Sequence, residues 1–205
     1  VPMKEESPAQ YLFFVTQKGI VKRVKVEDFD FIPRKGKIAI QLREDDELIN
    51  VKPTSGEDEI LIAGSNGKVI RFEEDEVRPM GRTASGVRGF NTDGGTVVGV
   101  AVSHEGKYLL SVSENGYGKR SEIDEYRKTN RGSKGVKTIN VTTKTGSLVA
   151  VRAVNGDEDA MIVTHKGIII RIALDHVGVY GRNTQGVKLI NVADDEMVTK
   201  VAVVA

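Results

Sequence analysis

Three sequence landmarks recur at a nearly constant interval, and this periodicity constrains the fold more than any other feature. The first is a turn-like glycine followed four residues later by arginine, as in QKGIVKR; the glycines are Gly19, Gly67, Gly116 and Gly167, at steps of 48, 49 and 51 residues. The second is a loop of the type Arg-x-x-x-Gly-Val-Lys/Arg, with glycines at Gly36, Gly86, Gly135 and Gly186. The third is an apolar alternation through Leu48, Val98, Val149 and Val198. Together they predict four copies of one unit of about 50 residues.

The pattern inside each unit is that of β-structure. Short apolar runs, rich in branched or aromatic residues, end in a turn and continue into a second strand-like run; they are YLFFVT, EILIAG, KYLLSVS and DAMIVT. Lys-Gly or Asn-Gly between two such runs is the signature of a β-hairpin. An acidic segment, the Arg…Gly loop, a short strand and the alternating strand follow. Each unit therefore has about four strands, and EDEVRPM or EIDEYRK suffices for at most one helical turn.

Four-stranded units at this period are typical of propeller blades, which need their neighbours to cover their apolar faces. We therefore predict an all-β fold, a β-pinwheel or β-propeller-like array of four blades over residues 10–205. The approximate blade boundaries are 10–56, 57–105, 106–156 and 157–205, with exchange of strands between neighbours left open. An open stack or a sandwich is the alternative fold. Residues 1–9 read as a linker or a cut end.

Bulk properties exclude several function classes. The 205 residues are 39% hydrophobic and 29% charged, which is typical of a folded protein, and no apolar run approaches the roughly 20 residues of a membrane span. The start of the chain lacks the apolar region of a signal peptide, and the absence of cysteine fits a reducing cytoplasm. A net charge of +1 gives no overall attraction to nucleic acid. Any electrostatic function must therefore come from how the charges are sorted.

Charge is sorted by position in the repeat. The Arg…Gly loops are rich in cations, whereas acids gather elsewhere, at 44–47, 57–59, 73–76, 157–159 and 194–196. Equivalent loops of a repeated fold occupy equivalent places, so the cations are expected to form one curved stripe. The candidate DNA-binding residues are Arg34, Lys35, Lys37, Arg78, Arg82, Arg88, Arg127, Lys128, Arg131, Lys134, Lys137, Arg182 and Lys188. The alternative is that these residues are ordinary solvated loop charges.

A basic stripe that recurs once per blade suits a polyanion that follows a curved surface. Duplex DNA carries about one charge per 1.7 Å of axis, so spaced loops can engage successive phosphates. The loop glycines would let the backbone approach phosphate oxygens closely. No recognition helix, zinc finger or aromatic platform points to base readout, so binding is expected to be sequence-independent. The hairpin arginines are interpreted as structural partners of nearby acids; they are Arg23, Arg71, Arg120 and Arg171.

No catalytic or metal site is predicted. The histidines His104, His165 and His176 fall at different repeat positions and share no ligand spacing. The sequence has no Gly-x-Ser-x-Gly elbow, no P-loop and no His-Glu-x-x-His motif. The acidic clusters are read as solvated loops.

Four segments resemble the C-terminal domain of DNA gyrase A: TSGEDEILIAGSNGKVIRF, VRPMGRTASGVRG, SENGYGKR and VYGRNTQGVKLINV. The resemblance covers nearly the whole chain. It implies a β-pinwheel whose basic rim bends duplex DNA and so supports ATP-dependent negative supercoiling by the whole enzyme. In this family the DNA-cleaving tyrosine belongs to a separate domain, so Tyr117, Tyr126 and Tyr180 are not nominated. The chain alone is therefore expected to be non-catalytic and to need no cofactor, with ATP and Mg implied only for the holoenzyme.

The resemblance also implies partners and a location. The partners are double-stranded DNA and, in a heterotetramer, the remainder of gyrase A together with gyrase B, in the cytoplasm at the nucleoid. The isolated chain is expected to be monomeric. Two alternatives remain open: the equivalent domain of topoisomerase IV, and a protein-interaction propeller whose basic loops are incidental. An interaction propeller need not repeat its cations in the same loop of every blade.

Two departures from the family pattern bear on wrapping. Gyrase domains of this kind usually carry six blades and a Gln-Arg-Arg-Gly-Gly-Lys-Gly box in the first, whereas this chain has four units and only a degenerate echo, NRGSKGVK, in the third. We interpret the chain as the last four blades. In the first unit, Lys35-Gly36-Lys37-Ile38 lacks the valine of Gly-Val-Lys/Arg and the loop is two residues shorter, so a slight displacement of its rim is expected.

Overall fold

The computed structural model describes residues 9–205, and residues 1–8 of the predicted linker lie outside the described part. The first unit contains β1 (Tyr11–Thr16), β2 (Ile20–Lys25), the 3-10 helix η1 (Val26–Phe29) and β3 (Leu48–Thr54). The second contains β4 (Glu59–Gly64), β5 (Lys68–Glu73), η2 (Glu74–Glu76), β6 (Val87–Arg88) and β7 (Val97–Val102). The acidic segments thus form single turns, as the sequence predicts.

The remaining two units repeat this order of elements. The 3-10 helix η3 (Ser103–Glu105) ends the second unit, and the third contains β8 (Tyr108–Ser113), β9 (Tyr117–Glu122), η4 (Ile123–Glu125), β10 (Val136–Lys137) and β11 (Leu148–Val154). The fourth contains β12 (Asp159–Thr164), β13 (Ile169–Ala173), η5 (Leu174–His176), β14 (Val187–Lys188) and β15 (Val198–Val204). Within residues 9–205 no helix is long and apolar enough to cross a membrane.

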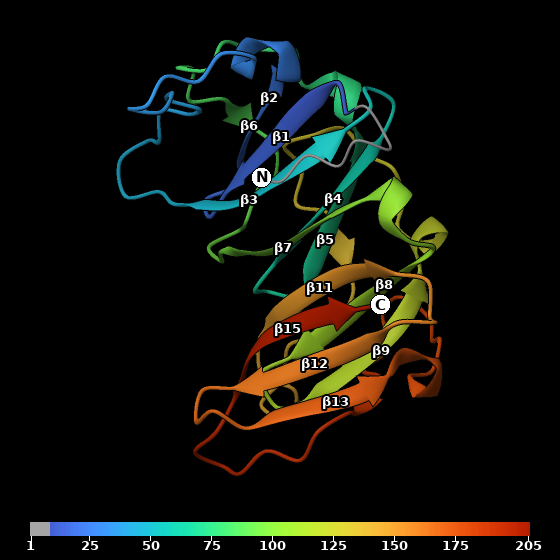
Figure 1. Cartoon of the computed structure of the whole chain (residues 1–205). Helices are drawn as coiled ribbons and strands as arrows, with labels where there is room; N and C mark the ends of the chain where they lie inside the picture. Colours follow the sequence, from blue (N-terminus) through green and yellow to red (C-terminus); the bar gives the residue numbers. More distant parts are fainter. Residues whose placement is uncertain (1–8) are drawn as a thin grey trace.

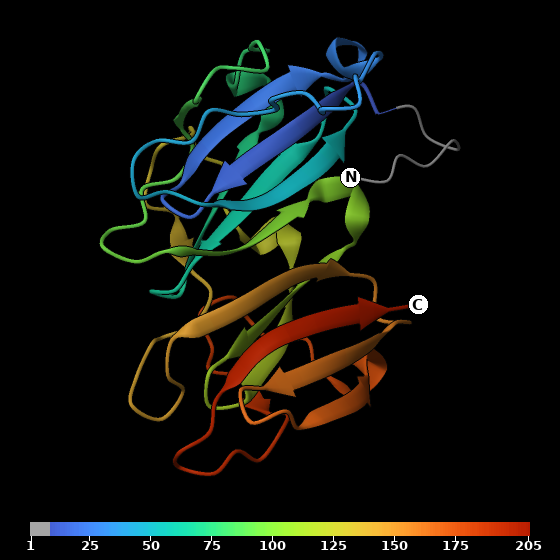
Figure 2. The same cartoon turned by 60° about the vertical axis from the view of Figure 1, so that its left-hand side comes forward.

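The strands form four antiparallel sheets, with the orders β3-β1-β2-β6, β7-β4-β5-β10, β11-β8-β9-β14 and β15-β12-β13. Figures 1 and 2 show the sheets following one another as blades, from the blue end of the chain to the red end. The inner strands β3, β7, β11 and β15 contact one another in succession. The all-β, propeller-like prediction is therefore confirmed, and the opposite edge of each sheet is its outer edge.

The fourth strand of each complete blade comes from the following unit. β6 pairs with β2, β10 with β5 and β14 with β9, each through a two-residue ladder. The prediction of four strands in every blade holds for the first three sheets, whereas the described part of the last sheet has three. The first unit contributes no short strand, because residues 33–43 run without regular structure. This fits the loss of the valine that the other three loops place in the ladder.

The hydrophobic core lies between blades. Successive residues of β4 alternate between its two faces, as the two-residue period of a strand requires. Ile60 and Ile62 belong to a buried cluster shared with Phe13 of the first blade. Leu61 belongs to a second cluster, shared with Leu109 of the third blade. Each blade therefore buries its apolar faces only against its neighbours, and burial of one such side chain stabilises the fold by about 1.5–3 kcal/mol.

Candidate nucleic-acid interface

The predicted basic loops lie along the outer edge of the blades. The short strands β6, β10 and β14 form this edge in the first three sheets. Each of them ends in a cation, Arg88, Lys137 or Lys188, and all three side chains are exposed. We call the loops around them, residues 33–43, 78–88, 127–137 and 181–188, the first to fourth rim loops.

Hydrogen bonds join the rim loops in series. Nη1 of Arg82 donates to the carbonyl oxygen of Ile38 at 3.0 Å, 44 residues earlier in the chain. Nη1 of Arg131 donates to the carbonyl of Arg88 at 2.9 Å, and Nη1 of Arg182 donates to that of Lys137. The three acceptors occupy the same position, two residues after the loop glycine. Each loop therefore contacts the loop before it, so the rim loops follow one another in one continuous row.

The first rim loop joins this row without a strand of its own. Nη2 of Arg43 donates to the carbonyl of Gly86 at 2.7 Å, and the backbone N–H of Gln41 approaches the carbonyl of Ala84 at 3.4 Å. Arg34 and Lys35 are exposed, whereas Lys37 is half-buried and its Nζ donates to the carbonyl of Asp28. The loop is therefore tied to the second rim loop but is otherwise open.

The rim glycines serve contacts between successive units within one blade. Gly86 has a φ of +104°, and a Cβ there would lie 2.3 Å from the carbonyl oxygen of Val21 in the preceding unit. The equivalent distance at Gly135 is 2.4 Å, to the carbonyl of Val69. Only glycine fits such a left-handed position against a neighbouring backbone. The close approach that the sequence suggested for phosphate is thus made to the next strand of the protein.

Ion pairing distinguishes the candidate cations. Nζ of Lys128 lies 2.6 Å from Oε1 of Glu73 and 3.3 Å from Oε1 of Glu59. Hydrogen bonds to Glu73 and Glu59 raise the pKa of Lys128 above its ordinary value. Lys134 pairs with Asp93 at 3.2 Å. Among residues 9–205 the other candidates form no ion pair, so they present uncompensated charge, whereas the charge of Lys128 is offset by two acids.

Three hairpin arginines pair with acids, and two of them, Arg23 and Arg71, also hold the following unit. Nε of Arg23 donates to the carbonyl of Val77 at 2.8 Å, and its guanidinium lies 3.5 Å from Glu74. Arg71 repeats this pattern with Tyr126 and with Glu59, and Arg171 pairs with Asp159. These three arginines pair with acids, as the sequence interpretation states.

Arg120 departs from that interpretation. It donates to the carbonyl of Val177 at 2.8 Å, and its guanidinium lies 5.1 Å from the centre of the Tyr108 ring. Within the described residues it pairs with no carboxylate. The carbonyl contact therefore carries its structural role, and the nearby acid that the interpretation expected is replaced by an aromatic ring.

Three further cations beside the rim were not predicted from the sequence. Lys22 and Lys119 are fully buried beneath the second and fourth rim loops. They share one signal, Gly-x-x-Lys-Arg in QKGIVKR and ENGYGKR, but a lysine in a strand-like run reads as solvated. Lys144 is exposed, and its Nζ lies 5.5 Å from the centre of the Tyr117 ring, with Nζ of Lys188 at 5.7 Å from the same ring. Lys144 thus extends the basic row beside the fourth rim loop.

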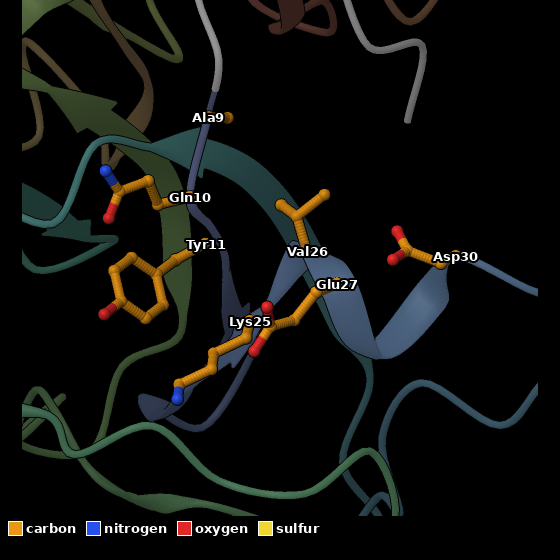
Figure 3. Close-up of a pocket in the computed structure, with 7 residues that line it drawn as sticks. All are labelled: Ala9, Gln10, Tyr11, Lys25, Val26, Glu27 and Asp30. Carbon is orange, nitrogen blue, oxygen red and sulfur yellow. The ribbon is translucent and has the colours of Figure 1, made fainter.

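The pocket in Figure 3 has no arrangement that suggests catalysis. It is formed by the start of β1 and by the end of β2 with η1, and its ionisable side chains include Tyr11, Lys25, Glu27 and Asp30. The guanidinium of Arg23 lies 4.2 Å from the centre of the Tyr11 ring. Over residues 9–205 no group of three or more His, Cys, Asp or Glu side chains is placed to hold a metal ion.

His104, His165 and Tyr126, none of which was nominated for catalysis, have ordinary structural contacts. Nδ1 of His104 lies 3.0 Å from Oδ1 of Asp58, and Nδ1 of His165 accepts from the backbone N–H of Met197. Tyr126 is fully buried, and its hydroxyl is 2.5 Å from Oγ1 of Thr138. Burial raises the pKa of Tyr126, so its hydroxyl stays protonated at neutral pH.

Known proteins resemble the chain over most of its length. A sequence model of the family described as DNA gyrase C-terminal domain, beta-propeller, matches residues 10–55, 58–104, 107–155 and 158–205. The DNA gyrase A protein of Ureaplasma parvum serovar 3 is 48% identical over 193 residues, which are 94% of this chain and 23% of that protein. The DNA gyrase A protein of Staphylococcus aureus strain MRSA252 is 48% identical over 200 residues, 96% of this chain and 23% of that protein. The chain therefore spans about a quarter of the length of these relatives.

Solved structures share the fold. A structure of a DNA gyrase A C-terminal domain has a TM-score of 0.85 at 26% identity, covering 98% of this chain and 68% of that one. A crystal structure of the C-terminal domain of DNA topoisomerase IV has a TM-score of 0.89 at 22% identity, covering 99% and 64%; at that identity it supports the fold alone. The resemblance stated from the sequence motifs is thus confirmed: the chain belongs to the DNA gyrase C-terminal domain family.

Proposed function

We propose that the rim loops bind duplex DNA and bend it around the outer edge of the blades. The observation that carries this proposal is the serial contact between loops, in which Arg82, Arg131 and Arg182 each reach the preceding loop. A row of uncompensated cations on a curved edge can neutralise successive phosphates of a duplex that follows the curve. Because the helices in residues 9–205 are short 3-10 turns and the rim loops carry no aromatic side chain, we expect contacts to the DNA backbone, with sequence preference limited to DNA deformability.

In the cell, this activity serves the whole enzyme. The chain acts as a non-catalytic wrapping module of gyrase A, and supports ATP-dependent negative supercoiling by a heterotetramer with gyrase B. ATP and Mg act on the catalytic domains, which lie in other parts of the holoenzyme. The module works in the cytoplasm at the nucleoid, and the isolated chain is a monomer that binds DNA weakly. The family match and the basic row support this assignment.

The test reverses rim charges that do not hold the fold together. Arg82, Arg131 and Arg182 are unsuitable because their guanidinium groups bond to neighbouring loops. The variant Arg88→Glu, Lys137→Glu, Lys188→Glu changes one exposed cation on each outer strand. With about six to eight phosphates contacted, log affinity of the wild type falls with log salt at a slope of about −5 to −7. The variant should lose at least about tenfold in affinity and about three units of this slope.

A matched control separates the rim from overall charge. The variant Lys25→Glu, Lys107→Glu, Lys200→Glu makes the same change in net charge at exposed positions away from the outer strands. It should bind a duplex of about 40 base pairs almost as tightly as the wild type at the same salt concentration, with unchanged circular dichroism. Equal DNA affinity of all three proteins would overturn the proposal and favour a protein-interaction propeller. Bending is measured separately, by the linking number of circular DNA closed in the presence of the chain.

A further inference from the structure

Lys22 lies on β2, fully buried beneath the second rim loop. Its Nζ donates to the carbonyl oxygens of Gly81, Arg82 and Ala84 at 3.0, 2.6 and 2.8 Å. An ammonium group has three N–H donors, so all of them are used. The acceptors lie in one turn of the loop, and the cation therefore fixes the path of the backbone that carries the Arg82 side chain.

Lys119 occupies the equivalent position on β9, beneath the fourth rim loop, and is also fully buried. Its Nζ donates to the carbonyls of Gly181 and Arg182 at 2.8 and 2.5 Å and to Oγ1 of Thr184 at 3.3 Å. The same turn is thus held in the same way two blades further along the rim. Within the described residues neither ammonium group forms an ion pair, and loop oxygens are their hydrogen-bond partners.

The third rim loop is built differently. The residue of β5 beneath it is Ile70, which is fully buried and apolar. The turn is held from within and from below: Ser133 Oγ lies 3.1 Å from Thr129 Oγ1 and donates to the carbonyl of Asn130, while the backbone N–H of Arg131 donates to Oε1 of Glu76. The sequences differ accordingly: GRTASG and GRNTQG lie over strands with a lysine at this position, and NRGSKG lies over a strand with an isoleucine.

We propose that Lys22 and Lys119 are positioning residues for DNA binding, whose buried ammonium groups hold the second and fourth rim loops in the shape that presents Arg82 and Arg182 to phosphate. This inference rests on the proposed function of the rim. A purely structural contact at these sites could be made by an apolar residue, as Ile70 demonstrates in the second blade. Burial of an ammonium group without an ion-pair partner is unfavourable for folding, and a role in presenting the loops accounts for its presence.

This arrangement couples DNA binding to protonation of the buried lysine side chains. Burial, and secondarily the guanidinium of Arg82, lower the pKa of Lys22 to about 8. The Phe14 ring, 5.6 Å from Nζ, is the aromatic neighbour from β1. A bound phosphate favours the protonated form, so DNA binding takes up protons near pH 8. A neutral amine has two donors for three carbonyl oxygens, and the turn loosens as the proton is lost.

Lys119 responds in the same direction. Burial lowers the pKa of Lys119 to about 8; Glu125 opposes this shift and Arg182 adds to it. The other ionisable group at this site, Tyr126, stays neutral over the range concerned because burial raises its pKa. Arginines remain charged up to pH 9 and solvated lysines nearly so, so a loss of affinity between pH 7 and pH 9 reports on the two buried lysines.

The experiment compares DNA affinity at pH 7 and pH 9 for three proteins in fixed salt. The wild type should lose about five- to tenfold in affinity over this range. The variant Lys22→Met, Lys119→Met should bind about tenfold more weakly at pH 7, with a nearly flat pH profile. Lys25→Met, Lys200→Met, which removes two exposed charges, should keep the wild-type profile. The rim reversal Arg88→Glu, Lys137→Glu, Lys188→Glu is measured alongside to test the proposed function itself.

The two ideas fail in different ways. A wild-type affinity that does not change between pH 7 and pH 9 overturns the positioning role, and this measurement needs no substitution. The role is also wrong if Lys22→Met, Lys119→Met and Lys25→Met, Lys200→Met bind equally while the rim reversal loses binding. If the variant Arg88→Glu, Lys137→Glu, Lys188→Glu binds DNA as tightly as the wild type, the proposed DNA-binding function of the rim is itself wrong.

Discussion

The first rim loop and the three that follow it carry similar charge but differ in how far the protein fixes their backbone. Residues 33–43 form no strand, and Phe31, just before this loop, is 75% exposed. In the other units the residue that directly follows the acidic 3-10 turn is buried; these residues are Val77, Tyr126 and Val177. Each of those loops lies on the blade before it. The comparison shows that the sequence of a loop determines its charge, whereas packing on the blade before it fixes the conformation of its backbone.

The largest expected difference is in the stability lost when Tyr126 or Phe31 is replaced by alanine. Tyr126→Ala should destabilise the fold by about 3–5 kcal/mol, because it removes a fully buried ring and leaves a cavity beside Thr138. Phe31→Ala should change the free energy of unfolding by less than about 0.5 kcal/mol, since the side chain is mostly in water. Urea unfolding at 25 °C measures both. Similar losses for the two variants would show that the first loop is packed as firmly as the third.

A second contrast uses two glycines with nearly the same backbone. Gly135 and Gly36 have φ values of +76° and +79°, but only at Gly135 would a Cβ meet a backbone atom, the carbonyl of Val69 at 2.4 Å. Gly135→Ala should cost about 3 kcal/mol or more, as strain and collision add, whereas Gly36→Ala should cost about 1 kcal/mol of left-handed strain. The difference between their urea midpoints isolates the contribution of the contact with the preceding unit. Equal urea midpoints for the two variants would show that this contact makes no contribution to stability.

The smallest expected effect is on the pH dependence of stability, and it distinguishes the rim loops that a buried lysine holds from the one that lies over isoleucine. The pKa of Lys22 and Lys119 is about 8 in the folded chain, below the ordinary 10.5, so between these values the unfolded chain binds more protons. Stability therefore rises with pH in this window. From pH 7 to pH 9.5 the wild type should gain about 1 kcal/mol per lysine relative to Lys22→Met, Lys119→Met, after allowance for screening near the rim. Parallel pH profiles of unfolding free energy would contradict this.

The local part of the fold was predictable from the sequence, because hairpins and acidic turns are written in neighbouring residues. YLFFVT-QKG-IVKR predicts β1, β2 and the turn at Gly19, which has a φ of +87°. The regular period predicted the blades and their basic loops. The exchange of outer strands could only be left open, because a two-residue strand such as Val87–Arg88 has no periodicity to detect.

The site was predictable in its charges but not in its supports. Arg82 and Lys137 could be nominated from loop composition alone, since charge needs no partner to be recognised. The role of Lys22 depends on three carbonyl oxygens 59 to 62 residues away, and no local pattern encodes them. For the same reason the sequence did not show that Glu59 and Glu73, which lie outside the basic loops, offset the charge of Lys128. Long-range partners decide which charges are buried, offset or free.

The sequence repeat and the folded blade do not have the same boundaries, because the outer strand of a blade belongs to the next repeat. This difference has a genetic consequence. Since β6, β10 and β14 each complete the sheet of the unit before them, removal of one repeat alters two sheets at once. Excision or duplication leaves whole sheets only when both breakpoints fall at the same position of two repeats. Unequal crossing-over between similar repeats meets this condition by its nature, because it joins homologous sites. Evolution can therefore lengthen or shorten the rim one blade at a time without creating an unpaired edge inside the array.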